Sequence, residues 1–379
     1  KASEKPVAAK GLTIDRFAEG LAHPRSLLRL PNGDILVAET NSPPRPKEGI
    51  VQRVMNYLMD KAGAGVPSAN RITLLRDRDG DGQTDLQTTF IDGLDAPYGL
   101  AFVDGKIYVA NQGNLVSFDY TEGATRIDGP GTEVTKLPSV INHHWTKAMT
   151  ASPDGSKLYV GIGSNSNVGE RGMDVEEDRA VIWEIDRQTG ANRIFASGIR
   201  NPTALSINPW TEQLWAVVNE RDELGPQLVP DYLTSVRQGA FYGWPYSYYG
   251  QHVDPRVRPQ RPDLVRKAIA PDYALGSHVA ALGLDFTTNG GLGGPFSEGA
   301  FVGEHGSWNR ADPVGYKVVF VPFRNGQPSG DPIDFVSGFL TDDGRTRGRP
   351  VGVTIDPDGA LIIADDLTNA IWRVTPDSP

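Results

Sequence analysis

The feature that most constrains the fold is a turn-and-strand pattern that occurs six times along the chain. In each copy, a turn with Asn-Gly, Asp-Gly or a polar substitute precedes a short apolar strand that ends on a polar residue. The copies are PNGDILVAE (31–39), VDGKIYVAN (103–111), PDGSKLYVGIGSN (153–165), PWTEQLWAVVNE (209–220), TNGGLGGPFSEGAFVGEH (288–305) and PDGALIIADD (357–366). Asn-Gly and Asp-Gly between apolar runs favour β-hairpins, because glycine adopts positive φ at little steric cost.

The spacing of these copies predicts a β-propeller. Six copies in 379 residues give about 63 residues per copy, the size of one four-stranded blade. Long helical periodicity is nearly absent, which argues against a barrel of alternating strands and helices. We therefore predict an all-β fold, a six-bladed β-propeller with four-stranded antiparallel blades, in a single domain over residues 1–379. A β-sandwich with repeated hairpins is the alternative, and the even spacing of the copies argues against it.

The main irregularity lies between the first two copies. Residues 47–70 form an insert in which the apolar residues from Ile50 to Met59 fall at roughly helical spacing. The insert is therefore predicted to contain a short amphipathic helix. It is either an excursion packed on the rim of the propeller or a docking surface for a membrane or a redox partner.

Composition narrows the classes of partner. A net charge of −10 without a strongly basic segment gives no support for nucleic-acid binding. No apolar run approaches the length of about 20 residues that a membrane span needs. The absence of cysteine excludes disulfides, thiol nucleophiles and cysteine-ligated metals. The chain starts KASEKPVAAK, without methionine, as after removal of a leader, so we expect a periplasmic or secreted protein.

The repeat also predicts where functional side chains gather, because equivalent residues of the blades surround the central channel of a propeller. One equivalent set ends the strands after the turns: Glu39, Asn111, Ser164 or Asn165, Asn219 or Glu220, Glu304 or His305, and Asp365 or Asp366. A second set precedes the turns: His23 and Arg25, Tyr98, His144, Arg200, His278 and Arg349. Propellers bind ligands at channel mouths, so we expect a site of histidines, arginines and carboxylates there. Alternatively, many of these residues cap loops or lie on solvated faces.

A separate motif, DRDGDGQTD, has the pattern of a calcium loop. It places four carboxylates at positions 1, 3, 5 and 9: Asp77, Asp79, Asp81 and Asp85. Gly82 stands at position 6, and the carbonyl of Gln83 can complete the coordination shell of a hard cation. Thr88 stands where an EF-hand has a bidentate glutamate, so we predict a structural calcium clip rather than a catalytic centre. An empty acidic turn is the alternative.

Several segments together resemble a known family. They are INHHWTKAM, SPDGSKLYVGIG, GIRNPTAL, NERDELG, FYGWPYSY, GEHGSWNR and IADD. They resemble the sorbosone dehydrogenase group of pyrroloquinoline quinone (PQQ) sugar dehydrogenases, which is similar to soluble glucose dehydrogenases and aldose sugar dehydrogenases. The resemblance runs from Gly11 to Pro376 and implies a six-bladed propeller. It also implies PQQ and Ca²⁺ as cofactors, an aldose, ketoaldose or aldehyde hydrate as substrate, and an external quinone or cytochrome as electron acceptor.

The resemblance assigns roles to individual residues. His144 would be the general base that takes the proton of the substrate hydroxyl while hydride passes to C5 of the quinone. Arg200 would stabilise the charge growing on the quinone oxygen, with Asn201 and Arg349 also contacting the cofactor. His143 points to the other face of the strand and is predicted to be a neighbour of the base, and Trp145 to pack between blades.

The same resemblance implies a calcium ion that clamps the cofactor through backbone carbonyls after the second strand of the fourth blade. In this chain that place falls near Glu220, Arg221 and Asp222. Calcium there would polarise the quinone as a Lewis acid. PQQ carries three carboxylates, which fits the number of arginines expected around the axis.

Three positions depart from the family pattern. Ser164 replaces the aspartate that holds the catalytic histidine, so Asn165 or a carboxylate from an adjacent blade would have to orient His144. The cofactor-contacting lysine of the fifth blade has no clear match, and the candidates in its place are His305, Asn309 and Arg310. Val351 replaces a second arginine. These departures make ordinary glucose no better a candidate than another aldose, an aldehyde hydrate or a ketoaldose.

Two other functions stay open. A six-bladed metal-dependent lactonase would place a similar polar set around a central metal, and the residues that imitate it are Glu39, Asn111, Asn219 and Asp365. Such a site has no need of Arg200 and Arg349, whereas an anionic cofactor does. The third possibility is a binding propeller without catalysis, which the replacement of the supporting aspartate by Ser164 keeps open.

Overall fold

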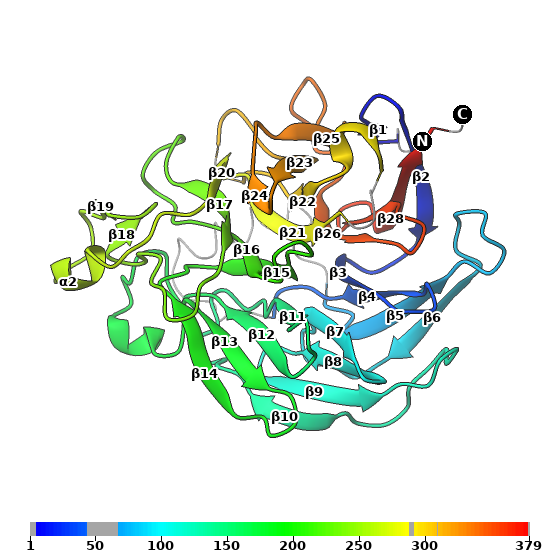
Figure 1. Ribbon diagram of the computed structural model, residues 1–379, viewed down its shortest axis with the longest axis horizontal. Coiled ribbons are helices and arrows are strands. Elements are labelled where there is room, and N and C mark those ends of the chain that lie inside the picture. Colours follow the sequence, from blue (N-terminus) through cyan, green and yellow to red (C-terminus); the bar gives the residue numbers. More distant parts are fainter. Residues whose placement is uncertain (1–4, 44–66, 288–291, 309, 378–379) are drawn as a thin grey trace.

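The chain forms six antiparallel sheets arranged around a central axis (Figure 1), which confirms the predicted six-bladed β-propeller. The computed structural model describes residues 5–43, 67–287, 292–308 and 310–377. The predicted helix of the 47–70 insert lies outside the described residues.

In blades 1 to 4, the order of the four strands across the sheet is their order along the chain. Blade 1 contains β3 (Pro24–Arg29), β4 (Ile35–Glu39), β5 (Arg71–Arg76) and β6 (Leu86–Ile91). Blade 2 contains β7 (Gly99–Val103), β8 (Lys106–Ala110), β9 (Asn114–Asp119) and β10 (Thr132–Lys136). Blade 3 contains β11 (Met149–Ala151), β12 (Lys157–Ile162), β13 (Val181–Asp186) and β14 (Asn192–Ser197). Blade 4 contains β15 (Pro202–Ile207), β16 (Leu214–Val218), β17 (Pro230–Ser235) and β20 (Tyr273–Ser277).

The last two blades take strands from the start of the chain. Blade 5 contains β21 (Ala281–Phe286), β22 (Gly299–Glu304), β23 (Lys317–Arg324), β25 (Ile333–Ser337) and then β1 (Val7–Ala8), with β24 (Gln327–Pro328) paired to β23. Blade 6 contains β26 (Pro350–Ile355), β27 (Leu361–Asp365), β28 (Ala370–Pro376) and β2 (Leu12–Glu19). Because β2 pairs with β28, with Leu12 opposite Pro376, the two ends of the chain close the ring. The sequence pattern did not predict this closure.

Short elements lie in the connections. They are the hairpin of β18 (Ser247–Tyr248) and β19 (His252–Val253), the helix α2 (Pro262–Val265), and two 3-10 turns at Met173–Glu176 and Gly294–Phe296. The hairpin and α2 project from blade 4 at the edge of the disc (Figure 1).

The six predicted hairpins are the first two strands of the six blades. Their turns therefore lie on one face of the disc, which we call the turn face. The opposite face holds the starts of the inner strands β3, β7, β11, β15, β21 and β26 and the ends of the second strands. We call this opposite face the site face, because both predicted sets of functional residues end there.

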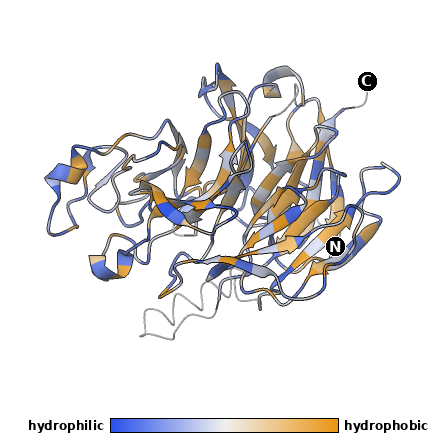
Figure 2. Ribbon diagram, turned by 60° about the horizontal axis from the view of Figure 1, so that its bottom comes forward, coloured by the Kyte–Doolittle hydropathy of each residue, from blue (hydrophilic) through white to orange (hydrophobic). Residues whose placement is uncertain are grey.

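Apolar side chains hold the blades together. Each predicted strand alternates its side chains between two faces, and both faces are covered by neighbouring blades, so the inner strands are buried on both sides. Figure 2 shows the hydrophobic residues concentrated along the strands and the connecting loops largely hydrophilic. Glycines let the inner strands approach closely: a Cβ on Gly283 would clash with the Val351 carbonyl, and one on Gly352 with the Arg25 carbonyl.

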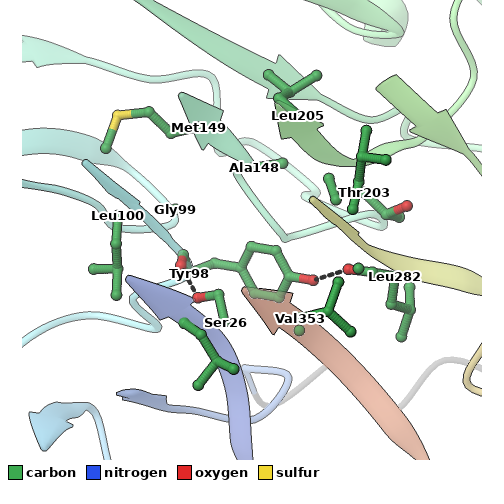
Figure 3. Close-up of a pocket in the computed structure, with 15 residues that line it drawn as sticks. Ser26, Tyr98, Gly99, Leu100, Ala148, Met149, Thr203, Leu205, Leu282 and Val353 are labelled. Atoms are coloured by element: carbon green, nitrogen blue, oxygen red, sulfur yellow. Dashed lines mark hydrogen bonds between the residues drawn. The ribbon is translucent and has the colours of Figure 1, made fainter. Parts of the chain in front are cut away.

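The axial channel is narrow. Residues of all six inner strands line it, and the cavity that they enclose has a volume of about 70 Å³. The hydroxyl of Tyr98 donates a hydrogen bond across it to the Leu282 carbonyl at 3.4 Å (Figure 3). Pockets for cofactor-sized ligands usually have volumes of about 300–1,000 Å³. The channel is therefore too small to enclose a multi-ring cofactor of the kind that the resemblance implies.

Candidate active site

His144 lies on the site face just before β11, and a backbone carbonyl orients its ring. Its Nδ1 is 2.8 Å from the Ser164 carbonyl oxygen and 3.1 Å from Ser164 Oγ. Since the carbonyl can only accept, Nδ1 carries the hydrogen and Nε2 carries the lone pair. The group that replaces the expected aspartate is thus the main chain of Ser164. Asn165 does not take this role, because its Oδ1 accepts from the backbone amide of His143.

The surroundings of His144 favour the neutral imidazole. Burial, then the positive charge of Arg200 and the neighbouring His143, lower the pKa of His144 well below its ordinary value. The His143 ring meets the His144 ring edge-on, with centroids 4.8 Å apart. Trp145 is buried between blades and packs edge-on against Tyr98 at 5.9 Å. A neutral imidazole with a fixed tautomer is the form that a general base needs.

Gly163 brings His144 and Asn201 together. A Cβ built on Gly163 would lie 2.6 Å from the His144 Cβ and would also clash with Asn201 Oδ1. Asn201 Oδ1 is buried and has no hydrogen-bond partner among the described residues. A buried polar atom without a partner is unfavourable unless a ligand satisfies it. Asn201 Oδ1 is therefore an acceptor beside His144 that a bound ligand could satisfy.

Replacing Gly163 with alanine is expected to lower kcat by at least about tenfold, because a displacement of a reacting group by about 1 Å can cost about 100-fold in rate. The added methyl group has to move both His144 and Asn201. The matched control is Gly105→Ala on the turn face, where nothing lies within 4 Å of the new Cβ but φ is +70°. Rates measured at equal folded fraction would contradict the close-packing argument if the two variants kept the same kcat.

Arg200 lies before β15 and is turned toward the end of β16. Its Nη1 donates to the carbonyls of Glu220 (2.8 Å) and Asn219 (3.2 Å), while Nε and Nη2 donate to the carbonyl and the side chain of Asn167. Two main-chain oxygens of the same loop thus face one cation. Asn219 Oδ1 is also buried and has no partner among the described residues.

These oxygens fit a hard cation. Calcium takes carbonyl and amide oxygens as ligands. The Glu220 carbonyl belongs to the loop predicted to bind calcium, whereas the Asn219 carbonyl precedes the predicted residues, and calcium binding there stays a prediction. In the structure the Arg200 guanidinium occupies the position in front of them.

The side chains of Arg221 and Asp222, which lie in this loop, bind residues outside it. Arg221 is buried, and its Nε pairs with Asp254 at 2.9 Å, so its cationic side chain is turned to that carboxylate. Asp222 binds His278 Nδ1 at 3.2 Å and lies 3.7 Å from Arg200 Nη2. The hydrogen bond to Asp222 raises the pKa of His278. A metal at this loop would therefore meet the carbonyls first and the Asp222 carboxylate second.

A buried carboxylate binds arginine and histidine side chains of blades 1, 5 and 6. Asp366 Oδ2 accepts from Arg25 Nη1 (2.6 Å) and His305 Nε2 (2.9 Å), and Oδ1 accepts from Arg349 Nε (3.1 Å). His23 Nε2 lies 3.4 Å from the same carboxylate. We call these five residues the Asp366 hub. The hub confirms that residues more than 300 positions apart converge on the site face.

The hub carries a positive charge. Burial would raise the pKa of Asp366, but His305, Arg25 and Arg349 outweigh burial and hold it well below its ordinary value. Burial lowers the pKa of His23 to about 4 and also lowers that of His305, so both rings are neutral at neutral pH. Two arginines thus face one carboxylate, which leaves a surplus positive charge for an anionic ligand.

The remaining cofactor candidates of blade 5 are placed as follows. His305 is in the hub, as described above. Arg310 donates from Nη1 to the carbonyls of Pro226 (2.8 Å) and Ser277 (3.5 Å), so it bridges the rim loops of blades 4 and 5. Asn309 lies outside the described residues. The contacts of His305 and Arg310 do not decide whether these side chains bind a cofactor. The cofactor-binding roles of His305, Asn309 and Arg310 therefore stay predictions.

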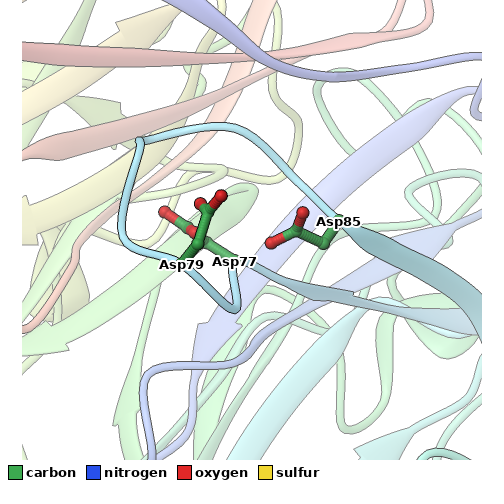
Figure 4. Close-up of side chains that lie close together, drawn as sticks. All are labelled: Asp77, Asp79 and Asp85. Carbon is green, nitrogen blue, oxygen red and sulfur yellow. The ribbon is translucent and has the colours of Figure 1, made fainter.

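The acidic loop lies on the turn face, between β5 and β6 and away from His144. The carboxylate oxygens of Asp77, Asp79 and Asp85 lie within 4.8 Å of one another (Figure 4). Asp81 is not in this group, and its Oδ1 accepts from the Gln83 amide at 2.8 Å. Asp77 accepts from the amides of Gly80 and Gly82. The geometry suits a structural clip, and calcium binding there stays a prediction.

Three of the four candidate lactonase residues have side-chain partners within their own blades. Glu39 is held by Arg71 and Thr73 within blade 1, and Asp365 accepts from the Arg349 amide and from Thr368 in blade 6. Asn111 binds Asn114 within blade 2. Among the described residues, the acidic loop is the one group of three or more His, Asp or Glu close enough to hold a metal ion.

Sequence reasoning missed several residues of the site. Arg25, His23 and Asp366 fell in the predicted sets of equivalent positions but received no role. Asn167 binds Arg200 from the long connection of blade 3, and Arg179 binds the His144 carbonyl from the end of the same connection. These two have no counterpart in the repeat, so the sequence held no signal for them.

None of the helices in the described part of the chain has the length and apolar character that crossing a membrane takes.

Fold and site together define a class of protein: a six-bladed propeller with an oriented, buried histidine beside an arginine and a positively charged hub at the channel mouth. Residues 6–238 and 262–377 match the family described as TrAA12-like, and the chain belongs to this family. It is 23% identical over 419 aligned residues to the pyrroloquinoline quinone-dependent sugar dehydrogenase of Hypocrea jecorina, covering 97% of this chain and 88% of that protein.

Solved structures share the fold. The iodide structure of a Trichoderma reesei family AA12 enzyme has a TM-score of 0.79 at 22% identity, covering 98% of both chains. The holo form of the PQQ domain of Coprinopsis cinerea pyranose dehydrogenase has a TM-score of 0.76 at 18% identity, covering 98% of this chain and 97% of that one. The predicted resemblance to PQQ-dependent sugar dehydrogenases is thereby confirmed.

Proposed function

We propose that this chain is a PQQ- and calcium-dependent dehydrogenase that oxidises a sugar or a related aldehyde, with His144 as the general base. The observation that carries the proposal is the orientation of His144: Nδ1–H is held by the Ser164 carbonyl, and Nε2 is left for the substrate hydroxyl beside Arg200 and Asn201. The family membership and the sugar dehydrogenase named above support the same reading.

Different residues of the chain have different roles in the proposed reaction. His144 Nε2 accepts the hydroxyl proton, and its low pKa keeps it unprotonated before the reaction. When bound, PQQ would accept the hydride and calcium would polarise it, so that the alcohol carbon becomes a carbonyl and an external acceptor later takes the electrons. Arg25, Arg349 and His305 supply cationic or donor groups for cofactor carboxylates. The carbonyls of Asn219 and Glu220, which accept from Arg200, would be available as oxygen ligands for a calcium ion.

Reconstitution of the apo-protein tests the proposal. After treatment with a chelator, dye-linked oxidation should return only when PQQ and Ca²⁺ are added together, and neither alone should suffice. A panel of aldoses, ketoaldoses and aldehydes would then identify the substrate class. No activity across the panel would refute the proposal, and lactone hydrolysis without PQQ would favour the hydrolase alternative.

A further inference from the structure

A buried arginine holds the segment that carries His144. Arg179 precedes β13 and is 4% exposed. Its Nη2 donates to the His144 carbonyl (3.0 Å), and its Nη1 donates to the Pro138 carbonyl (2.8 Å) and to Asn142 Oδ1 (3.0 Å). Arg179 therefore binds residues 138–144 at three points and ties them to blade 3.

A lysine supports the same segment. Lys147 is fully buried, and its Nζ donates to Asn142 Oδ1 and to the Trp145 carbonyl, both at 2.9 Å. Burial, then the charge of Arg179, lowers the pKa of Lys147 well below its ordinary value. Lys147 thus joins two acceptors of the same segment.

The segment depends on these hydrogen bonds because its own backbone is unfavourable. Ile141 (φ 65°) and Asn142 (φ 52°) both adopt the left-handed conformation, which is costly for a β-branched residue such as isoleucine. Apolar burial does not compensate, since Val140 is 81% exposed and Ile141 is 45% exposed. Strained segments persist where the surroundings over-determine them, and they cluster at functional sites.

We propose that Arg179 is a positioning residue for the base, because its three hydrogen bonds fix the segment that carries His144. The Arg179 charge also lowers the pKa of His144, after burial, Arg200 and His143. The kinetic part of this inference rests on the function proposed above. The charged or titratable groups around the imidazole are Arg200 from blade 4, His143 from the same segment and Arg179 from blade 3. Burial lowers the pKa of Arg179 to about 10, so it is still charged at neutral pH. Glu176 faces Arg179, and Glu170 faces His143.

Titration of the histidine signals by NMR in the apo-protein tests the electrostatic part without any cofactor. The His144 signal is identified by its loss in His144→Ala. Arg179→Met removes the positive charge and places an uncharged side chain in the same buried position, so the pKa of His144 should rise. The matched control is Arg187→Met, which removes an arginine that also binds a backbone carbonyl, that of Gly155, but on the turn face. An unchanged pKa in Arg179→Met, or the same rise in Arg187→Met, would overturn the proposal.

Steady-state kinetics of the reconstituted enzyme test the positioning part. Arg179→Met should lower kcat by about 10- to 100-fold, as expected when a reacting group is misplaced, with PQQ affinity and KM nearly unchanged. Asn142→Gly is a second variant, and glycine tolerates the left-handed backbone. It loses the Oδ1 acceptor of Arg179 and Lys147 together with the amide that donates to Gln112, so it should fold and also lose kcat. Full activity of Asn142→Gly would refute the positioning role. Absence of PQQ-dependent activity in the unmodified protein would instead refute the proposed function and leave the NMR result standing.

Discussion

Replacing His144 with alanine is expected to lower kcat by about 10²- to 10⁴-fold, the range over which a general base contributes to a reaction. Nδ1 of His144 is committed to the Ser164 carbonyl, so Nε2 is the atom that takes the substrate proton. The affinity for PQQ should stay close to that of the unmodified protein, because the Asp366 hub and the carbonyls after β16 are not touched. Turnover measured by dye reduction and PQQ binding measured by calorimetry separate the two effects.

Two control variants sharpen the result. His143→Ala removes the ring that meets His144 edge-on, yet it leaves the base and its carbonyl partner in place, so kcat should fall little. Ser164→Ala removes Oγ and keeps the carbonyl at 2.8 Å, so most of the rate should remain. If His143→Ala lowered kcat as much as His144→Ala, the role of the base could no longer be assigned to His144 rather than His143. A large loss in Ser164→Ala would show that the hydroxyl, and not the carbonyl, orients the ring.

The blades were predictable from the sequence because their signal is local. A turn with Asn-Gly or Asp-Gly fixes the geometry of the hairpin around it. Five such turns and one polar substitute, in the copy at 209–220, placed the first two strands of every blade. Ring closure was not predictable in this way. It pairs Leu12 with Pro376, and no local pattern records a partner at that distance.

Within the candidate site, the sequence predicted only those residues that occupy equivalent positions of the repeat. Equivalent positions correctly brought Arg25, Arg349 and Asp366 to one place. The group that orients His144 was missed because it is a backbone carbonyl, which every residue has. Arg179 was missed because it lies in an irregular connection, and its three acceptors are set by the fold of a strained segment.

The hub gives the second large effect: Asp366→Asn is expected to destabilise the cofactor-free protein by about 3–5 kcal/mol, the usual cost of leaving a buried charge without its partner. The side chain of Asp366 is 0% exposed and accepts from both Arg25 and Arg349. Asparagine keeps the shape but removes the only carboxylate in the hub, so the two guanidinium groups would repel each other. Urea unfolding of the apo-protein measures this loss.

The informative measurement is how much of the lost free energy of unfolding is regained when PQQ is added. If cofactor carboxylates bind the hub arginines, PQQ supplies the missing negative charge, and it should stabilise Asp366→Asn more than it stabilises the unmodified protein. Asp356→Asn is the matched control, because Asp356 pairs with Arg373 at 2.9 Å in the same blade but at the turn face. PQQ should stabilise that variant no more than the unmodified protein. Equal stabilisation of all three would mean that the cofactor does not meet the hub, and the surplus charge of Arg25 and Arg349 would then have to serve an anionic group of the substrate.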